Sequence, residues 1–167
     1  MDEIEKRFEE ITSHPDTVHP DAIMLGNPSF LISDKPLQSR YYADCNAVVI
    51  LSPDLVGLSH YNLKNSPPEE YLPRLIAEML AATNNGSLSA VPVGGDREHF
   101  ERNKRILGDH KIPIVGEYCD GWEEGETLPL DFSGRKSEKA DKHLVVVPST
   151  QEVLMFSNPV GYKRLTQ

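Results

Sequence analysis

The chain has 167 residues, of which 38% are hydrophobic and 26% charged, and its net charge is −9. This length suits one domain with a sizeable core, and the acidic balance argues against a sequence-independent nucleic-acid binder or a binder of anionic membranes. No apolar run approaches the roughly 18 residues of a membrane span, so we expect no membrane insertion.

The first forty residues predict little regular structure. Residues 2–11 are expected to form a short charged helix with its apolar residues on one stripe. This acidic, polar start predicts neither a secretory signal nor a transit peptide. Prolines recur between residues 15 and 40, so only short strands fit there, and 30–32 is the strongest of them.

A β-hairpin is predicted next. Residues 46–51 (NAVVIL) are rich in β-branched residues, the following SPD is typical of a turn, and 55–63 predict the returning strand. Directly opposed residues of an antiparallel pair share a face of the sheet. A loop with an even number of residues therefore puts Cys45 and His60 on the same face, roughly 5 to 8 Å apart between their β-carbons. A three-residue loop would put them on opposite faces.

Two helices are predicted after the hairpin. Ser66 is a candidate N-cap for the first, whose apolar residues recur at helical spacing from 72 to 80. Pro73 marks either the regular start of this helix or a kink. Asp96 is a candidate N-cap for the second helix, which runs to about residue 110 and buries Phe100, Asn103, Ile106 and Leu107.

The remaining elements are expected to be strands at 88–93, 112–118 (with an interruption), 127–132, 143–147 and 152–156, with a turn at Gly94-Gly95 and an exposed charged loop at 133–142. Strands outnumber helices, and the helices lie in the middle of the chain. This pattern favours a single-domain α+β fold, with a β-rich core of two packed sheets and two main helices outside.

Cys45 and His60 are the strongest candidates for chemistry. An imidazole beside a thiol can generate the thiolate, which is the nucleophilic form of cysteine. Ser39 and Asn62 are the nearest residues able to orient the imidazole, and the backbone N–H of Cys45 with a neighbouring N–H could hold an oxyanion. Free cysteines are more often inert core residues, but Asp44 and Asn46 give this one a polar setting.

Other candidates are weaker. The two cysteines cannot form a disulfide framework and indicate a reducing compartment; Cys119 is expected to be structural or a bystander. A metal site from Cys45, Cys119, His60 and His99 is conceivable, but no close Cys/His doublet supports it. The Gly94-Gly95-Asp96 sequence could hold an anion, although a tight connection explains it better. His14, His19, His110 and His143 are expected on the surface, and Trp122 is either an exposed contact or a core anchor.

From about residue 38 to 135 the order of motifs resembles the CheD family of chemoreceptor glutamine deamidases. DCNAVVILSPDLVGLSHYNL resembles that family's catalytic segment, with Cys45 opening a strand and His60 following after a turn and a glycine. LPRLIAEMLAA, AVPVGGD, ERNKRIL, KIPIVGEYCDGW and the SGR at 133–135 resemble the elements that follow it, in the same order. The Cys–His pair also recurs in related bacterial toxin deamidases of the cytotoxic-necrotizing-factor type.

The resemblance implies a CheD-like domain over 38–160, preceded by an N-terminal extension over 1–37. It also implies hydrolysis of a protein glutamine side chain to glutamate, without a metal or an organic cofactor. Cys45 would be the nucleophile and His60 the general base, while Ser39 would take the place of a threonine whose hydroxyl assists the pair. The substrate would be a glutamine-bearing receptor in the cytoplasm or, for a secreted effector, a host protein.

Two other functions remain open. The family usually carries Gly-Ser before its cysteine, whereas this chain has Ala43-Asp44, and an acidic neighbour opposes thiolate formation. The chain could therefore be a binding module that keeps the fold without the chemistry, since CheD proteins also bind a phosphatase and receptor helices. The third possibility is a metal-dependent hydrolase.

Overall fold

The computed structural model describes residues 22–40, 45–64, 66–122, 142–157 and 161–166. The strands are β1 (Ile23–Leu25), β2 (Ser29–Ser33), β3 (Leu37–Ser39), β4 (Asn46–Leu51), β5 (Val56–His60), β6 (Ser89–Asp96), β7 (Tyr118–Trp122), β8 (Lys142–Val147), β9 (Glu152–Ser157) and β10 (Gly161–Arg164), and the helices are α2 (Pro68–Ala82) and α3 (Arg97–Asp109).

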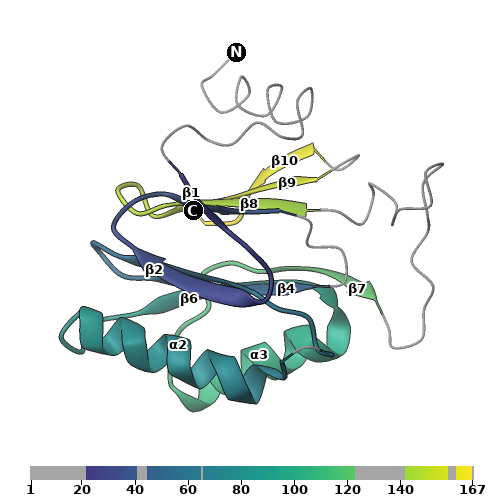
Figure 1. Ribbon diagram of the computed structural model, residues 1–167, viewed down its shortest axis with the longest axis horizontal. Coiled ribbons are helices and arrows are strands. Elements are labelled where there is room, and N and C mark those ends of the chain that lie inside the picture. Colours follow the sequence, from purple (N-terminus) through teal and green to yellow (C-terminus); the bar gives the residue numbers. More distant parts are fainter. Residues whose placement is uncertain (1–21, 41–44, 65, 123–141, 158–160, 167) are drawn as a thin grey trace.

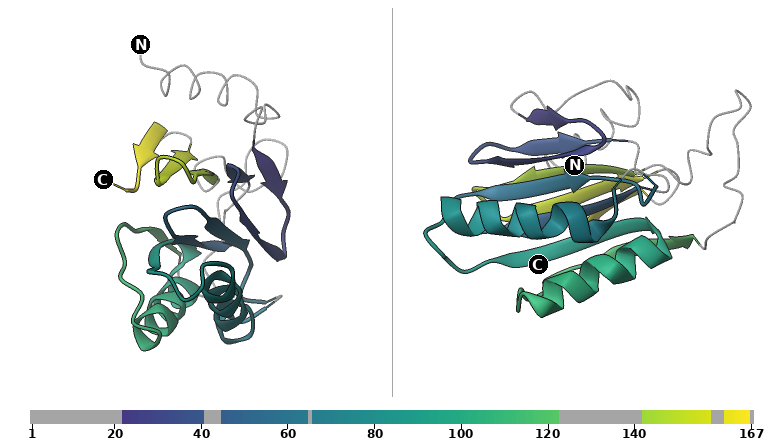
Figure 2. Two further views of the ribbon diagram at one scale, coloured as in Figure 1. Left: turned by 90° about the vertical axis from the view of Figure 1, so that its left-hand side faces the viewer. Right: turned by 60° about the horizontal axis from the view of Figure 1, so that its bottom comes forward.

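The strands form two five-stranded sheets. The order β1-β3-β8-β9-β10 defines the β8 sheet, and the order β2-β5-β4-β6-β7 defines the β4 sheet. The two sheets lie face to face, and α2 and α3 cover the other face of the β4 sheet (Figures 1 and 2). This arrangement confirms the predicted α+β fold with two packed sheets and two helices outside.

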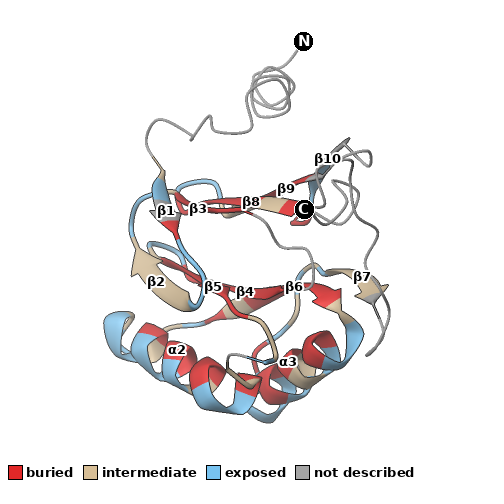
Figure 3. Ribbon diagram, turned by 45° about the vertical axis from the view of Figure 1, so that its right-hand side comes forward, coloured by how far each residue is buried: buried red, intermediate tan, exposed pale blue. Residues whose placement is uncertain are grey.

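The continuous apolar run of β4 follows from its central position, because a strand covered on both faces needs apolar residues at every position. Ala47, Val49 and Leu51 belong to the core between the sheets, while Val48 and Ile50 belong to the core beneath the helices. Figure 3 shows buried residues on the facing strands and on the inner sides of both helices. The β4 sheet is therefore the middle layer of the molecule.

The helix starts agree only in part with the capping predictions. Asp96 caps α3, since its carboxylate accepts a hydrogen bond from the backbone N–H of His99 at 2.7 Å. The prediction that Ser66 caps the first helix is wrong: the N-cap of α2 is Pro67, and no side chain caps it. The helix continues through Pro73 because buried residues on both sides of that proline, Leu72 and Leu75 among them, anchor it to the β4 sheet.

The turn predicted at Gly94-Gly95 is wrong, and the interrupted strand predicted at 112–118 is only partly present. Gly94 and Gly95 belong to β6 instead of forming a turn, and Gly94 pairs directly with Asn46 of β4. A β-carbon at Gly94 would lie 2.4 Å from Nδ2 of Asn46, so the glycine permits close strand contact rather than a reversal. Of the interrupted strand expected at 112–118, Ile114 forms a single bridge with Ala90 and Tyr118 begins β7.

Several predictions lie outside the described residues: the helix at 2–11, the strand at 127–132, residues 133–141 of the charged loop, Ala43-Asp44, His14, His19 and the side chain of Trp122. The last residue of that predicted loop, Lys142, is instead buried at the start of β8. The short strands β1, β3 and β10 were not predicted, because their sequences carry little periodic signal. His110 is exposed as expected. His143 is half-buried on β8 instead, and burial, with a contribution from the nearby Arg40, lowers its pKa to about 4.

Candidate functional site

The β4–β5 hairpin places Cys45 and His60 on one face of the β4 sheet. Its loop has four residues, 52–55, and the register pairs Leu51 with Val56 and continues to a bridge between Asn46 and Tyr61. Cys45 therefore lies across from residue 62 and diagonal to His60, as an even-numbered loop requires. Diagonal neighbours are about 7 to 8 Å apart along the strands, within reach of long side chains.

The loop keeps this register through the side chain of Ser52. Its hydroxyl accepts a hydrogen bond from the N–H of Leu55 at 3.1 Å and donates to the carbonyl of the same residue at 3.0 Å. The backbone N–H of Ser52 also donates to that carbonyl at 3.0 Å. These local bonds hold the reversal at four residues and so determine which face His60 occupies.

Ser39 comes from the facing sheet and orients His60. Its Oγ lies 2.8 Å from Nδ1 of His60 and donates its only proton to the carbonyl of Leu25 at 2.9 Å. The hydroxyl must then accept the proton of Nδ1–H. This assignment leaves the lone pair of the neutral imidazole on Nε2, which is the atom available to act as a base.

The surroundings of Cys45 combine an apolar wall with the polar side chain of Asn27. The residue is 5% exposed and packs in the core between the sheets, while His60 is 3% exposed. Nδ2 of Asn27, in the loop between β1 and β2, lies 3.7 Å from Sγ of Cys45. The thiol is therefore largely buried, with a hydrogen-bond donor beside it.

The other candidate for orienting the imidazole, Asn62, takes part in a local turn, whereas Ser39 is bonded to Nδ1 of His60. Oδ1 of Asn62 accepts a hydrogen bond from the backbone N–H of Lys64 at 2.9 Å, as part of this turn. The N–H of Asn46 is also engaged, since it donates to the carbonyl of Tyr61 at 2.8 Å. Of the backbone donors expected for an oxyanion, the N–H that follows Cys45 in the chain is therefore committed to the sheet.

Cys119 lies on β7, where burial raises its pKa. It is half-buried and, like Cys45, is a free thiol. The next residue, Asp120, forms an ion pair with Lys142 of the β8 sheet and accepts a hydrogen bond from the hydroxyl of Tyr118 at 2.9 Å. Since Lys142 is only 1% exposed, this pair fixes the two sheets together at the β7 edge.

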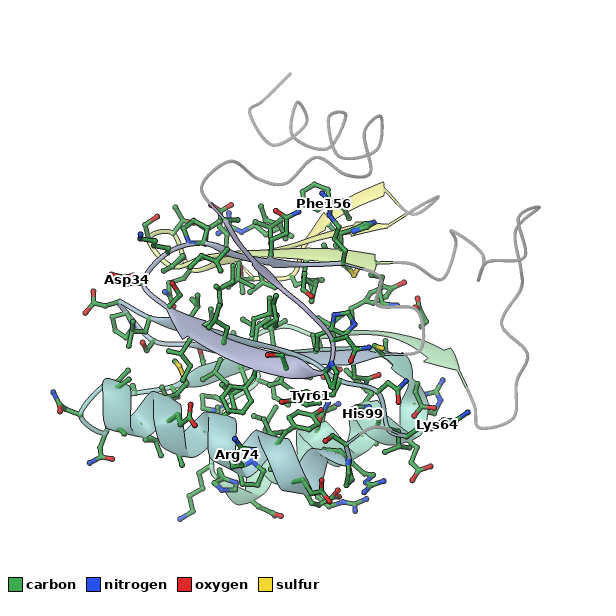
Figure 4. The ribbon with its side chains drawn as sticks, in the orientation of Figure 1. Asp34, Tyr61, Lys64, Arg74, His99 and Phe156 are labelled. Atoms are coloured by element: carbon green, nitrogen blue, oxygen red, sulfur yellow. The ribbon has the colours of Figure 1, made fainter. Side chains whose placement is uncertain are left out.

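A second polar cluster lies beneath the helices, on the opposite face of the β4 sheet (Figure 4 labels its members Tyr61 and His99). The rings of Tyr61 and Tyr71 stack at 3.7 Å. The hydroxyl of Tyr71 lies 2.6 Å from Nε2 of His99 and donates to Oδ1 of Asn103 at 3.2 Å. Burial lowers the pKa of His99 to about 4 and raises that of Tyr71. Of this cluster, the sequence predicted that Asn103 faces inward and named His99 as a conceivable metal ligand, but it did not predict their contacts with Tyr71.

The four residues considered for a metal site do not come together. His99 belongs to the helix-side cluster, whereas Cys45 and His60 face the other sheet. Within the described ranges, no three His, Cys, Asp or Glu side chains form a group that could hold a metal ion. No helix in the same ranges is long and apolar enough to cross a membrane.

No family model of known proteins matches the chain, and no curated protein matches it.

Proposed function

We propose that the protein is a cysteine-dependent hydrolase that converts glutamine side chains of other proteins to glutamate. The observation that carries the proposal is the convergence of three residues from two sheets: Cys45, His60 on the same sheet face, and Ser39 bonded to Nδ1 of His60 at 2.8 Å. The CheD-like order of motifs around Cys45 supports a carboxamide as the substrate group.

The reaction follows from the orientation of the imidazole. Nε2 of His60 accepts the thiol proton, and the Cys45 thiolate attacks the carboxamide carbon to give a tetrahedral oxyanion. When the oxyanion collapses, the C–N bond breaks and Nε2–H protonates the leaving nitrogen, which departs as ammonia. Water, deprotonated by the same Nε2, then hydrolyses the thioester to release glutamate and the free thiol.

Ser39 has a positioning role in this scheme. Because its hydroxyl proton is directed to the carbonyl of Leu25, the serine accepts from Nδ1–H throughout the cycle and keeps the ring in the tautomer whose lone pair is on Nε2. When Nε2 gains a proton, the same hydrogen bond stabilises the cation, since charge-assisted bonds are stronger than neutral ones.

The burial of the site favours a second candidate function. With Cys45 at 5% and His60 at 3% exposure, a glutamine side chain needs an opening to reach the sulfur. If the site stays closed to substrates, the protein would be a CheD-like binding module with no catalytic activity. In that case, replacing Cys45 by serine would leave binding unchanged.

Comparing serine variants of the two cysteines distinguishes the hydrolase from the binding module. We would incubate the protein with casein, an unfolded protein with accessible glutamines, and measure the conversion of glutamine to glutamate by peptide mass spectrometry. Deamidation should be lost in Cys45→Ser and kept in Cys119→Ser, which is the matched control because Cys119 lies outside the proposed site.

Iodoacetamide alkylation provides a readout without a substrate. Near neutral pH, Cys45 in the Cys119→Ser variant should react faster than Cys119 in the Cys45→Ser variant, because alkylation follows the thiolate. Equal or slower alkylation of Cys45 would contradict the proposed nucleophile and favour the binding module.

A further inference from the structure

The loop between β1 and β2 crosses from one sheet to the other at the candidate site. β1 belongs to the β8 sheet and β2 to the β4 sheet. At one end of the loop, the carbonyl of Leu25 accepts the hydroxyl proton of Ser39, and at the other, Ser29 pairs with His60 in the sheet. The two ends of the loop are therefore bonded to Ser39 and His60, the orienting residue and the proposed base.

The loop itself is exposed and carries one polar side chain next to the sulfur. Residues 26–28 are all exposed, and Nδ2 of Asn27 lies 3.7 Å from Sγ of Cys45. A carboxamide N–H is a hydrogen-bond donor, and such bonds strengthen when the acceptor becomes an anion. The contact is therefore weak for the thiol and much stronger for the thiolate.

Neighbouring backbone donors are occupied by the sheet. The N–H of Asn46 donates to the carbonyl of Tyr61 at 2.8 Å. The N–H of Gly95 lies 3.3 Å from both the carbonyl of Cys45 and Oδ1 of Asn46. These two donors are therefore committed to the sheet, and the exposed loop supplies a further donor next to the sulfur through the side chain of Asn27.

We infer that Asn27 is a further catalytic residue, whose side-chain amide donates to the Cys45 thiolate and then to the oxyanion formed from the substrate. The inference rests on the proposed function for its second part, because only a carbonyl substrate creates an oxyanion. As the S–C bond forms, the carbonyl π electrons move to oxygen, so negative charge leaves sulfur and appears on the oxygen bonded to the attacked carbon. The same donor can follow it, and C–N cleavage returns the electrons to the carbonyl.

The test uses Asn27→Ala and Asn27→Asp in the Cys119→Ser background, with Asp34→Ala as a control in the next exposed turn. The first readout is the rate of iodoacetamide alkylation of Cys45 against pH. Asn27→Ala should move the midpoint upward by about one pH unit, the size expected for one lost charge-assisted hydrogen bond at a partly exposed site. Asn27→Asp should move it further, because the new carboxylate repels the thiolate.

The second readout is turnover of a blocked Gln-Gly dipeptide. Asn27→Ala should lower kcat by about 10²-fold with little change in KM, the pattern of a donor that acts mainly in the transition state. Asp34→Ala should change neither readout. If Asn27→Ala fails to fold, Asn27→Asp decides the outcome, since it has almost the same shape.

An alkylation profile and a kcat that both stay unchanged in Asn27→Ala would overturn the inference, even in an active enzyme. Absence of turnover in the parent protein, combined with a shifted alkylation profile in Asn27→Ala, would overturn the proposed function and the oxyanion part. The role of Asn27 at the sulfur anion would stand in that case.

Discussion

Acid should destabilise this protein through a histidine that is remote from the candidate site. His99 is fully buried beneath the helices. Because the hydroxyl of Tyr71 donates to Asn103, it accepts from Nε2–H of His99, which leaves the lone pair on Nδ1. Among the described residues, no group lies within hydrogen-bonding reach of Nδ1, so a proton added there would be buried without an acceptor.

The size of the effect follows from the difference between the pKa of His99 in the unfolded chain and its pKa in the folded protein. Burial, helped by the charge of Arg102 and opposed by that of Glu69, lowers the pKa of His99 from 6.5 to about 4. The unfolded chain therefore takes up a proton before the folded one does. Stability is fully present above the unfolded pKa and falls as the pH drops from 6.5 towards 4. The loss is about 2 kcal/mol at about pH 5 and about 3 kcal/mol once the folded histidine titrates.

Urea unfolding at about pH 7.5 and about pH 5 would measure this loss for the parent protein and for His99→Gln. The glutamine variant should lose about 2 kcal/mol less on acidification, because it has no buried imidazole to protonate. His110→Gln is the matched control, since His110 is exposed at the end of the same helix. His143 contributes in the same direction, so some acid sensitivity should remain. Equal losses in the parent and His99→Gln would refute the assignment.

Two further predictions concern the site and the sheet beside it. Ser39→Ala should lower kcat by about tenfold, through the loss of one buried hydrogen bond to His60; Ser39→Thr should retain most of the activity, and equal losses in both would contradict a role for the hydroxyl. Gly94→Ala should lower the free energy of unfolding in urea by about 1 to 3 kcal/mol, because its β-carbon would lie 2.4 Å from Nδ2 of Asn46. Gly108→Ala is the control, because Gly108 has open space around it in α3. This substitution should raise the free energy of unfolding by about 1 kcal/mol. A similar increase in Gly94→Ala would contradict the close contact with Asn46.

Local sequence patterns predicted the elements whose causes are local. The β-branched run 46–51 and the turn after it became the β4–β5 hairpin, and the carboxylate of Asp96 caps α3. Such features depend on side-chain periodicity and on bonds between residues a few positions apart. The sequence left the length of the hairpin loop open, and the four-residue loop of the structure places Cys45 and His60 on one face of the sheet.

Contacts between the sheets required the tertiary structure. From the residues alone, Ser39 and Asn62 were both candidates to orient His60, and the resemblance implied Ser39. The docking of the β8 sheet onto the β4 sheet brings Ser39 to the imidazole, across 21 positions of the chain. The sequence did not predict a role for Asn27, because an exposed asparagine before a proline has the same local pattern in any turn. Burial of the thiol, likewise, depends on how two apolar faces pack together, and no periodicity along one strand encodes that packing.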